Sequence, residues 1–303
     1  MPLRAIARLA LPNALACLLA LLAACATTGS RRRRAAGILL GVCALAPAWL
    51  LPIDGPLFRA ASALLAFSWT MRIVDLRRGQ WTLRDRLAHV ASVVDTRRLT
   101  DSPTRLDARG LVVGLAWSSL AAVAYVVLGA SRSLDPRELW STRWGSALVL
   151  AYSGVAAGYS FGHAVYAALG FETGPLHVAP LLSRSVQEFW GERWARPVST
   201  WLRETFFRPL ALRHHLVGGA LLAFSVSAAF HAYGVWIALG FTRGLVMAGW
   251  MLGYFIVQAV ILGLERLLGV KRWAPWRGHV WTVFWMLATA PLFLEPAVRV
   301  LGR

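Results

Sequence analysis

Eight apolar runs, each long enough to cross a lipid bilayer, constrain what this chain of 303 residues can fold into. About 20 apolar residues in a helix span roughly 30 Å of hydrocarbon, and in lipid only helices or closed barrels satisfy every backbone polar group. The expected spans are residues 9–29, 35–53, 56–74, 110–130, 144–170, 214–239, 243–263 and 278–298. These runs predict an all-α integral membrane protein with about eight transmembrane helices.

Composition agrees with a membrane protein and disfavours two other classes. The chain is 57% hydrophobic and 15% charged, yet its formal net charge is +18. A nucleic-acid binder would carry such charge as stripes on a soluble fold, whereas here the arginines cluster between apolar runs. The three cysteines, Cys17, Cys25 and Cys43, lack metal-ligand spacing. We therefore expect membrane lipids around the chain, no nucleic-acid partner and no metal site.

The distribution of basic residues predicts the orientation. Alternate connections between the spans carry 22 lysines and arginines on one side and 8 on the other. By the positive-inside rule the richer side is cytoplasmic, so both termini are expected in the periplasm. Arg59 and Arg72, near the ends of the third span, are expected to snorkel to the lipid head groups. The arginine-rich composition favours a bacterial inner membrane.

The N-terminal segment leaves two interpretations open. Residues 1–25 resemble a cleaved lipoprotein signal, with Leu22-Ala23-Ala24-Cys25 as its cleavage box. The four arginines Arg31–Arg34 favour a retained span instead, because they oppose translocation.

The connection 75–109 combines eight arginines with five aspartates, which predicts a solvated, partly helical cytoplasmic loop with little chemistry.

The connection 171–213 is both basic and aromatic. Ser185 and Glu188 have the spacing of a capping box, which predicts a helix start. Val186, Trp190 and Trp194 then recur on one helical face, and Pro197 is expected to end this helix. A second amphipathic piece with Trp201 and Phe206 is expected to end at Pro209. Neither piece is long enough to span the membrane.

Two interpretations of these short helices remain open at this point. They are short interfacial amphipathic helices on the cytoplasmic face that anchor the chain, or they form a basic pocket for an anionic, partly apolar ligand. The arginines that would line such a pocket are Arg193, Arg196, Arg203, Arg208 and Arg213.

One histidine lies deep in an apolar run. His231 follows His215 by 16 residues, which places it about 24 Å along a helix at 1.5 Å per residue. An ionisable residue at that depth indicates a functional site, with a hydrogen-bonded packing histidine as the alternative. His163 is the next candidate. The remaining histidines lie at span boundaries (His214, His215, His279) or in loops (His89, His177).

An ordered series of short motifs carries a family resemblance. Its central part consists of Glu188-Phe189-Trp190-Gly191-Glu192-Arg193-Trp194, Trp201-Leu202-Arg203, Phe207-Arg208-Pro209-Leu210 and Ser227-Ala228-Ala229-Phe230-His231. The later part consists of Tyr254–Gln258, Glu265, Trp281-Thr282 and Thr289–Phe293. The series resembles the wax synthase branch of the membrane-bound O-acyltransferases. It covers residues 155–297 of a single domain at 1–303, preceded by N-terminal spans at 1–154.

The chain departs from the family pattern at three places. Ala195 stands where the pattern has His or Asn, and Glu192 where it has Arg. The Ser-Gly-x-x-His-Glu pattern is replaced by Ser227-Ala228-Ala229-Phe230-His231-Ala232. In the wider superfamily an Asn or Asp in this region is thought to assist the histidine, so Ala195 is the departure with the largest expected effect on activity.

The resemblance implies an O-acyltransferase that moves a fatty acyl group from acyl-CoA to a lipophilic alcohol, giving an ester. It implies His231 as general base and no bound cofactor, because acyl-CoA is a substrate. The expected donor-site and motif residues are Glu188, Phe189, Trp190, Gly191, Arg193, Trp194, Arg196 and Arg203. Two alternatives remain: an acyltransferase for a sterol, carotenoid or envelope sugar, and a non-catalytic membrane protein or transporter.

Overall fold

The computed structural model describes residues 2–27, 30–92, 94–131 and 136–302. Within them, eight helices are long and apolar enough to cross a membrane. They cover Ala7–Ala26, Arg31–Leu50, Pro56–Asp75, Ala108–Ala130, Ser141–Ala168, Leu216–Leu239, Phe241–Leu268 and Pro275–Val300. The prediction of an all-α integral membrane protein with eight spans is confirmed. Two of the arginines counted for the orientation, Arg132 and Arg303, lie outside the described residues.

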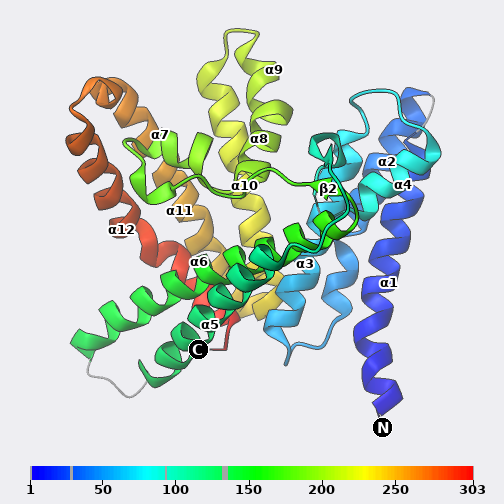
Figure 1. Cartoon of the computed structure of the whole chain (residues 1–303), viewed down its shortest axis with the longest axis horizontal. Coiled ribbons are helices and arrows are strands. Elements are labelled where there is room, and N and C mark those ends of the chain that lie inside the picture. The colour runs from blue at the N-terminus through cyan, green and yellow to red at the C-terminus, as the bar shows by residue number, and fades with distance from the viewer. Residues whose placement is uncertain (1, 28–29, 93, 132–135, 303) are drawn as a thin grey trace. The chain divides into compact units, whose positions relative to one another are not determined.

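Short elements join the long helices (Figure 1). In chain order the elements are α1 (Pro2–Ala26), α2 (Arg31–Cys43), η1 (Ala46–Leu50), α3 (Pro56–Asp75), α4 (Leu83–Ala91), η2 (Thr96–Arg98), β1 (Thr100–Asp101), α5 (Ala108–Ala130), α6 (Pro136–Ala168), β2 (Phe171–Glu172), η4 (Pro180–Leu182), α7 (Val186–Glu188), η5 (Phe189–Arg193), α8 (Arg196–Leu202), η6 (Arg203–Phe207), α9 (Arg208–Ala211), α10 (Leu216–Leu239), α11 (Phe241–Leu268), η7 (Val270–Arg272) and α12 (Pro275–Val300).

The chain forms two compact units. The first comprises Met1–Arg97, Phe230–Ala248 and Val300–Gly302, and the second comprises Arg98–Ala229 and Gly249–Arg299. Helices α10, α11 and α12 each contribute to both units. The expected division near residue 155 falls inside α6, and that division stays a prediction.

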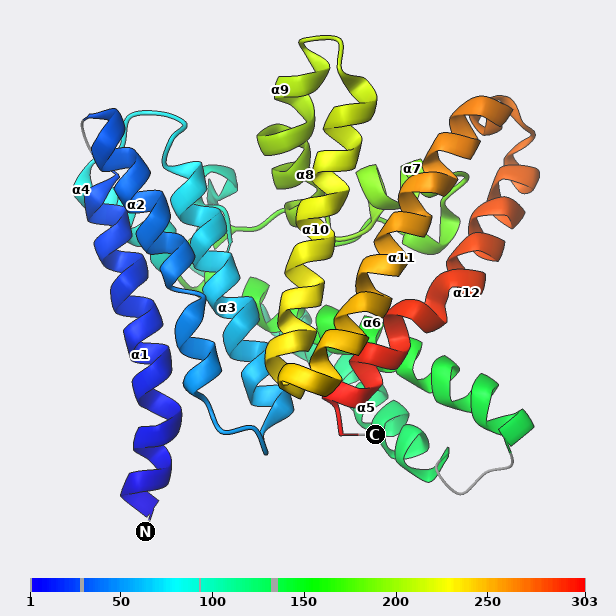
Figure 2. The same ribbon diagram turned by 180° about the vertical axis from the view of Figure 1, so that it is seen from behind.

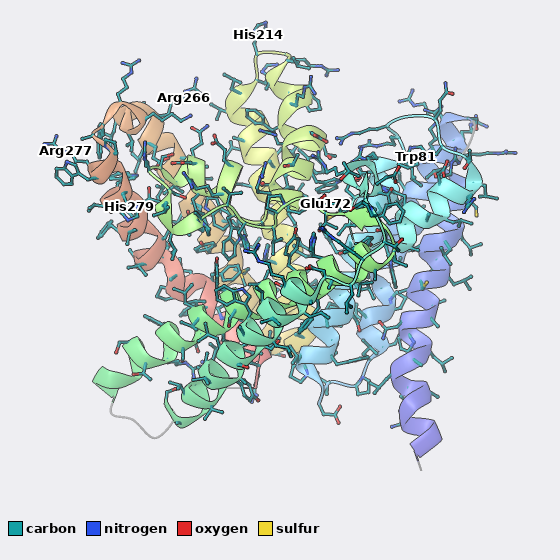
Figure 3. All side chains as sticks on the ribbon, in the orientation of Figure 1. Trp81, Glu172, His214, Arg266, Arg277 and His279 are labelled. Atoms are coloured by element: carbon teal, nitrogen blue, oxygen red, sulfur yellow. The ribbon has the colours of Figure 1, made fainter. Side chains whose placement is uncertain are left out.

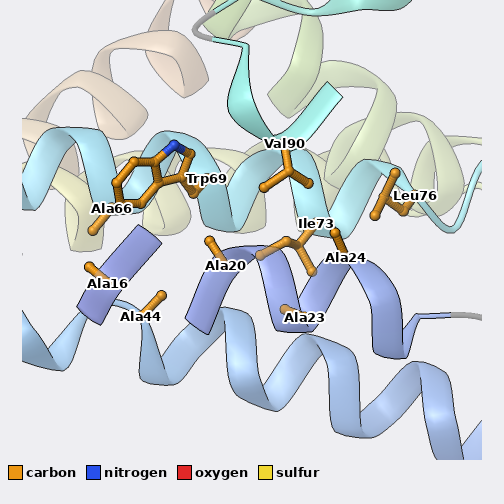
Figure 4. Close-up of a cluster of buried hydrophobic side chains, with 10 residues drawn as sticks. All are labelled: Ala16, Ala20, Ala23, Ala24, Ala44, Ala66, Trp69, Ile73, Leu76 and Val90. Carbon is orange, nitrogen blue, oxygen red and sulfur yellow. The ribbon is translucent and has the colours of Figure 1, made fainter. Parts of the chain in front are cut away.

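Small residues let α1, α2 and α3 pack closely in the first unit. Ala16, Ala20, Ala23 and Ala24 of α1 are buried in one cluster that also contains Ile73 of α3 (Figure 4). Between apolar helices in lipid, close van der Waals packing replaces the hydrophobic effect as the main source of association. Two glycines of α2 allow this close packing. A Cβ at Gly37 would lie 2.5 Å from Thr27 Cγ2, and one at Gly41 would lie 2.8 Å from Ile73 Cδ1.

A buried ion-pair network lies at the C-terminal end of α3. Asp75 and His89 are completely buried and Asp95 is 7% exposed. An Arg97 nitrogen lies 3.1 Å from Asp75 and 2.7 Å from Asp95, and Arg72 is 3.4 Å from Asp75. The helix expected in the connection 75–109 is present as α4, but the expectation of a solvated loop is wrong at Asp75, His89 and Asp95, which are buried. Because these opposite charges lie close together, they stabilise one another away from water.

Arg72 therefore does not snorkel to the head groups as expected, since it is 5% exposed within this network. Asp75, His89 and Asp95 are also close enough together to hold one metal ion, with ligand atoms within 4.8 Å of one another. The guanidinium groups of Arg72 and Arg97 already balance the two carboxylates, however. The cluster is accounted for as an ion-pair network.

The second unit contains the α5–α6 hairpin and the α11–α12 hairpin (Figure 2). Gly114 of α5 allows the contact with α6, because a Cβ there would lie 2.8 Å from the Phe161 ring. Strands β1 and β2 pair antiparallel, with Thr100 opposite Glu172. Arg266 and Arg277 lie near the connection between α11 and α12 (Figure 3).

Candidate functional site

The motif segment begins at a capped helix start. Ser185 Oγ accepts a hydrogen bond of 2.9 Å from the Glu188 backbone N–H, as the capping-box spacing predicts. The Glu188 carboxylate does not accept from the Ser185 backbone N–H, as it would in a full capping box. Its carboxylate accepts instead from the Arg184 backbone N–H at 2.7 Å. Burial opposes ionisation of Glu188, but this N–H and the Arg193 side chain lower the pKa of Glu188 below its usual value.

A carboxylate from a distant helix satisfies the other free N–H groups of this helix start. Glu265 of α11 accepts from the backbone N–H of Val186 at 2.6 Å and of Gln187 at 3.0 Å. It also accepts from Trp281 Nε1 at 3.0 Å. The Glu265 side chain is buried, so these three donors take the place of water.

A second hydrogen-bond chain ties the motif to α11 and α12. Trp190 Nε1 donates to Gln258 Oε1 at 3.0 Å, and Gln258 Nε2 donates to Thr289 Oγ1 at 2.8 Å. Gln258 is completely buried. The structure thus brings together motif pieces that the sequence shows only as separate segments. The Trp190 ring also packs edge-on against Phe224 and Tyr254, so Trp190 is more than an interfacial anchor.

Sequence reasoning missed His177, which it left in a loop. The His177 ring stacks on Trp194 with centroids 4.3 Å apart, and on Tyr152 at 5.6 Å. Trp194 in turn stacks on Phe189 at 5.6 Å. The Ala195 backbone N–H donates to His177 Nδ1 at 3.0 Å, which places the ring proton on Nε2. Burial lowers the pKa of His177, which favours the neutral form of the ring.

The two prolines begin helices where the sequence analysis expected them to end helices. The first piece ends in a wide turn at Phe189–Arg193. Ala195 then adopts a left-handed conformation with φ 41°, and Pro197 lies in the first turn of α8. Pro209 lies likewise in the first turn of α9. A proline fits the first turn because it needs no N–H there.

The arginines of the motif divide into two kinds. Arg193 holds the local fold, because it donates to Glu188 at 2.7 Å and to the carbonyls of Val178 and Ala179 at 3.1 and 3.2 Å. Arg196 and Arg203 are exposed. A groove of about 350 Å³ is lined by Val178, Glu188, Gly191, Glu192, Arg193, Arg196, Thr200 and Arg203. Arg203 and Arg208 also line a neighbouring groove of about 390 Å³.

The expected motif residues Glu188, Phe189, Trp190, Gly191, Arg193, Trp194, Arg196 and Arg203 all belong to the second unit. His231 lies in the part of α10 that belongs to the first unit, where it is half-buried. Its neighbour Phe230 packs on Phe67 of α3 with centroids 3.9 Å apart, and the Phe230 and His231 rings are 5.0 Å apart.

The other candidate histidine has polar partners. His163 Nδ1 lies 2.7 Å from Thr173 Oγ1, and its Nε2 lies 3.7 Å from Asp107. This arrangement fits the packing role that was its alternative interpretation. His279 (Figure 3) likewise holds the Ser183 carbonyl, with Nδ1 3.2 Å from that oxygen.

Comparison with known proteins places the chain near acyltransferases. It is 29% identical over 133 residues to a long-chain-alcohol O-fatty-acyltransferase of Simmondsia chinensis, covering 41% of this chain and 34% of that protein. It is 30% identical over 134 residues to the acetyltransferase ple2 of Rhodocybe pseudopiperita, covering 39% of this chain and 35% of that protein. The matches thus span about a third of each relative's length. No protein-family model matches the chain.

Proposed function

We propose that this integral membrane protein is an O-acyltransferase that moves a fatty acyl group from acyl-CoA to the hydroxyl of a lipophilic alcohol. The similarity to two acyltransferases supports the reaction class. The observation that carries the proposal is the groove lined by Arg193, Arg196 and Arg203 on a segment that buried hydrogen bonds hold to α11 and α12.

The donor's phosphates would bind the exposed arginines of this groove. Guanidinium groups bind phosphate oxygens by charge-assisted, often bidentate hydrogen bonds. Arg196 and Arg203 are exposed and line the groove, whereas Arg193 already has a carboxylate and two carbonyls as partners. In the expected orientation this connection is cytoplasmic, the side on which acyl-CoA is made.

His231 would supply the base. The neutral imidazole takes the proton of the alcohol hydroxyl while the oxygen attacks the thioester carbonyl. The new C–O bond forms the ester, the C–S bond breaks, and the thiolate of coenzyme A takes the proton back from the imidazolium. An apolar helix environment favours this reaction because it excludes water, which would compete as the nucleophile.

Transfer of a shorter acyl group is the second candidate function. It is favoured by one observation, the similarity to a protein named as an acetyltransferase. The groove arginines would serve either donor, because they would bind the coenzyme rather than the acyl chain.

The direct test uses the purified protein in lipid nanodiscs with radiolabelled acyl-CoA and a long-chain alcohol. Formation of labelled ester is expected, and more with palmitoyl-CoA than with acetyl-CoA. His163→Gln serves as the control for a histidine in another span. Absence of ester with both donors, across long-chain alcohols and sterols, would contradict the proposal.

A further inference from the structure

Arg59 is a buried charge without a polar partner. It lies in the first turn of α3 and is 3% exposed, although it was expected to snorkel to the head groups. Among the described residues it forms no hydrogen bond or ion pair, and its Nε atom is fully buried without an acceptor. The nearest acid in sequence, Asp54, is exposed. Burying a guanidinium costs free energy unless an acceptor meets it.

The Arg59 guanidinium instead lies over the Trp49 ring, 5.7 Å from its centroid. Trp49 packs edge-on against Trp236 of α10, with centroids 5.1 Å apart. The Trp236 Nε1 atom is also buried and without an acceptor. The Tyr233 hydroxyl donates to the Leu45 carbonyl at 2.5 Å and accepts from neither Arg59 Nε nor Trp236 Nε1.

Two donors without acceptors therefore border one aromatic ring in the first unit. Buried Ala48, Ala63 and Ile237 pack beside it with Trp49 and Tyr233, so the surroundings are apolar. A cation–π contact balances part of the charge of Arg59. It supplies no hydrogen-bond acceptor for Arg59 Nε or Trp236 Nε1, which can only donate.

We propose that Arg59 and Trp236 form a binding site for the phosphate group of a membrane lipid. The site requires an anion with several acceptor oxygens, which matches phosphate and the fork of N–H groups on arginine. Arg59 lies 16 residues before Asp75 on α3, about 24 Å along the helix. Arg59 and the ion-pair network around Asp75 therefore lie at opposite ends of this span, and lipid phosphates are abundant at both membrane faces.

Binding of short-chain lipids to the purified protein in neutral detergent tests the site. The probes are dioctanoyl phosphatidic acid, dioctanoylglycerol and inorganic phosphate, and bound lipid is counted by native mass spectrometry. We expect phosphatidic acid to bind and dioctanoylglycerol not to bind. Arg59→Gln should weaken binding at least about tenfold, because a charge-assisted contact is lost. Trp236→Phe should weaken it about two- to tenfold, because one donor is lost and the ring remains.

Arg243→Gln is the matched control, since Arg243 is an exposed arginine of the same unit. It should change the affinity less than twofold. Competition by inorganic phosphate would assign the site to phosphate itself, and its absence would assign the site to phospholipid head groups. Equal effects of Arg59→Gln and Arg243→Gln would overturn the proposal. If Arg59→Gln does not fold, unchanged binding by Trp236→Phe overturns it instead.

Discussion

Glu265 of α11 accepts a hydrogen bond of 2.6 Å from the backbone N–H of Val186, the first residue of α7. The two residues are 79 positions apart in sequence. A single buried carboxylate thereby fixes the start of the motif segment to a transmembrane helix. The orientation of the groove arginines depends on this anchor, because the same segment carries them a few residues later.

Glu265→Gln should destabilise the protein. The amide nitrogen of glutamine cannot accept, so at least one of the three N–H donors loses its acceptor, at a cost of about 1 to 3 kcal/mol. Thermal unfolding in detergent measures the change. Glu192→Gln is the control, because Glu192 is exposed. Equal unfolding temperatures for the two variants would contradict the anchoring role.

The Arg203→Ala and Arg193→Ala variants should have different defects, one in donor binding and one in stability. Arg203→Ala should raise the KM for acyl-CoA, with a loss of about 1 to 3 kcal/mol, and leave the unfolding temperature unchanged. Arg193→Ala should mainly lower the unfolding temperature, because Glu188 and the carbonyls of Val178 and Ala179 each lose one donor. Arg84→Ala, at an exposed arginine of α4, should change neither the KM nor the unfolding temperature. Identical kinetic effects of all three variants would indicate general surface charge only.

The parts of the fold that were predictable from sequence are local. A span is recognised by its own length and apolarity, and the Ser185 cap by a spacing of three residues. The partners of Glu265 and Trp190 lie in distant segments, and no local pattern indicates them. His177 was missed for the same reason: its ring is positioned by Trp194 and Tyr152, which come from elsewhere in the chain.

Pro197 and Pro209 show a different limit of prediction from sequence. A proline is favoured at a helix start and disfavoured in a helix interior, so the residue alone does not distinguish an end from a beginning. At Pro197 the left-handed backbone of Ala195 decides the matter. That conformation is uncommon for alanine, and sequence reasoning therefore had no signal for it.

Ala195→Asn and Ala195→Gly should both stabilise the segment. Ala195 has a φ of 41°, and asparagine and glycine adopt the left-handed region more readily than alanine, by about 1 kcal/mol. Neither change removes the backbone N–H that His177 accepts. Activity of Ala195→Asn should be unchanged or raised, since its side chain adds a hydrogen-bonding group. Unfolding temperatures measure the first effect, and lower values in both variants would contradict it.

The Asp95 network predicts a stability that depends on pH. Burial opposes ionisation of Asp95, but hydrogen bonds and charge from Arg97 lower its pKa from 3.8 to about 2. Because the folded pKa is below the unfolded one, the stabilisation is present above about pH 4 and is lost as the pH falls toward 2. It amounts to about 2 kcal/mol. Asp95→Asn should reduce stability at pH 7 and flatten this dependence, and an unchanged slope would argue against the ion pair.

The last prediction concerns His231. If it is the general base, His231→Ala should lower kcat by a factor of about 10² to 10⁴. The KM for acyl-CoA should stay nearly constant, because the groove arginines lie on another segment. His163→Gln should retain most activity, since His163 is engaged with Thr173 and Asp107. Single-turnover ester formation in nanodiscs, with the unfolding temperature as a check of folding, separates chemistry from stability. A folded His231→Ala protein that esterifies at the wild-type rate would remove His231 from the mechanism and leave the donor groove as the supported part of the site.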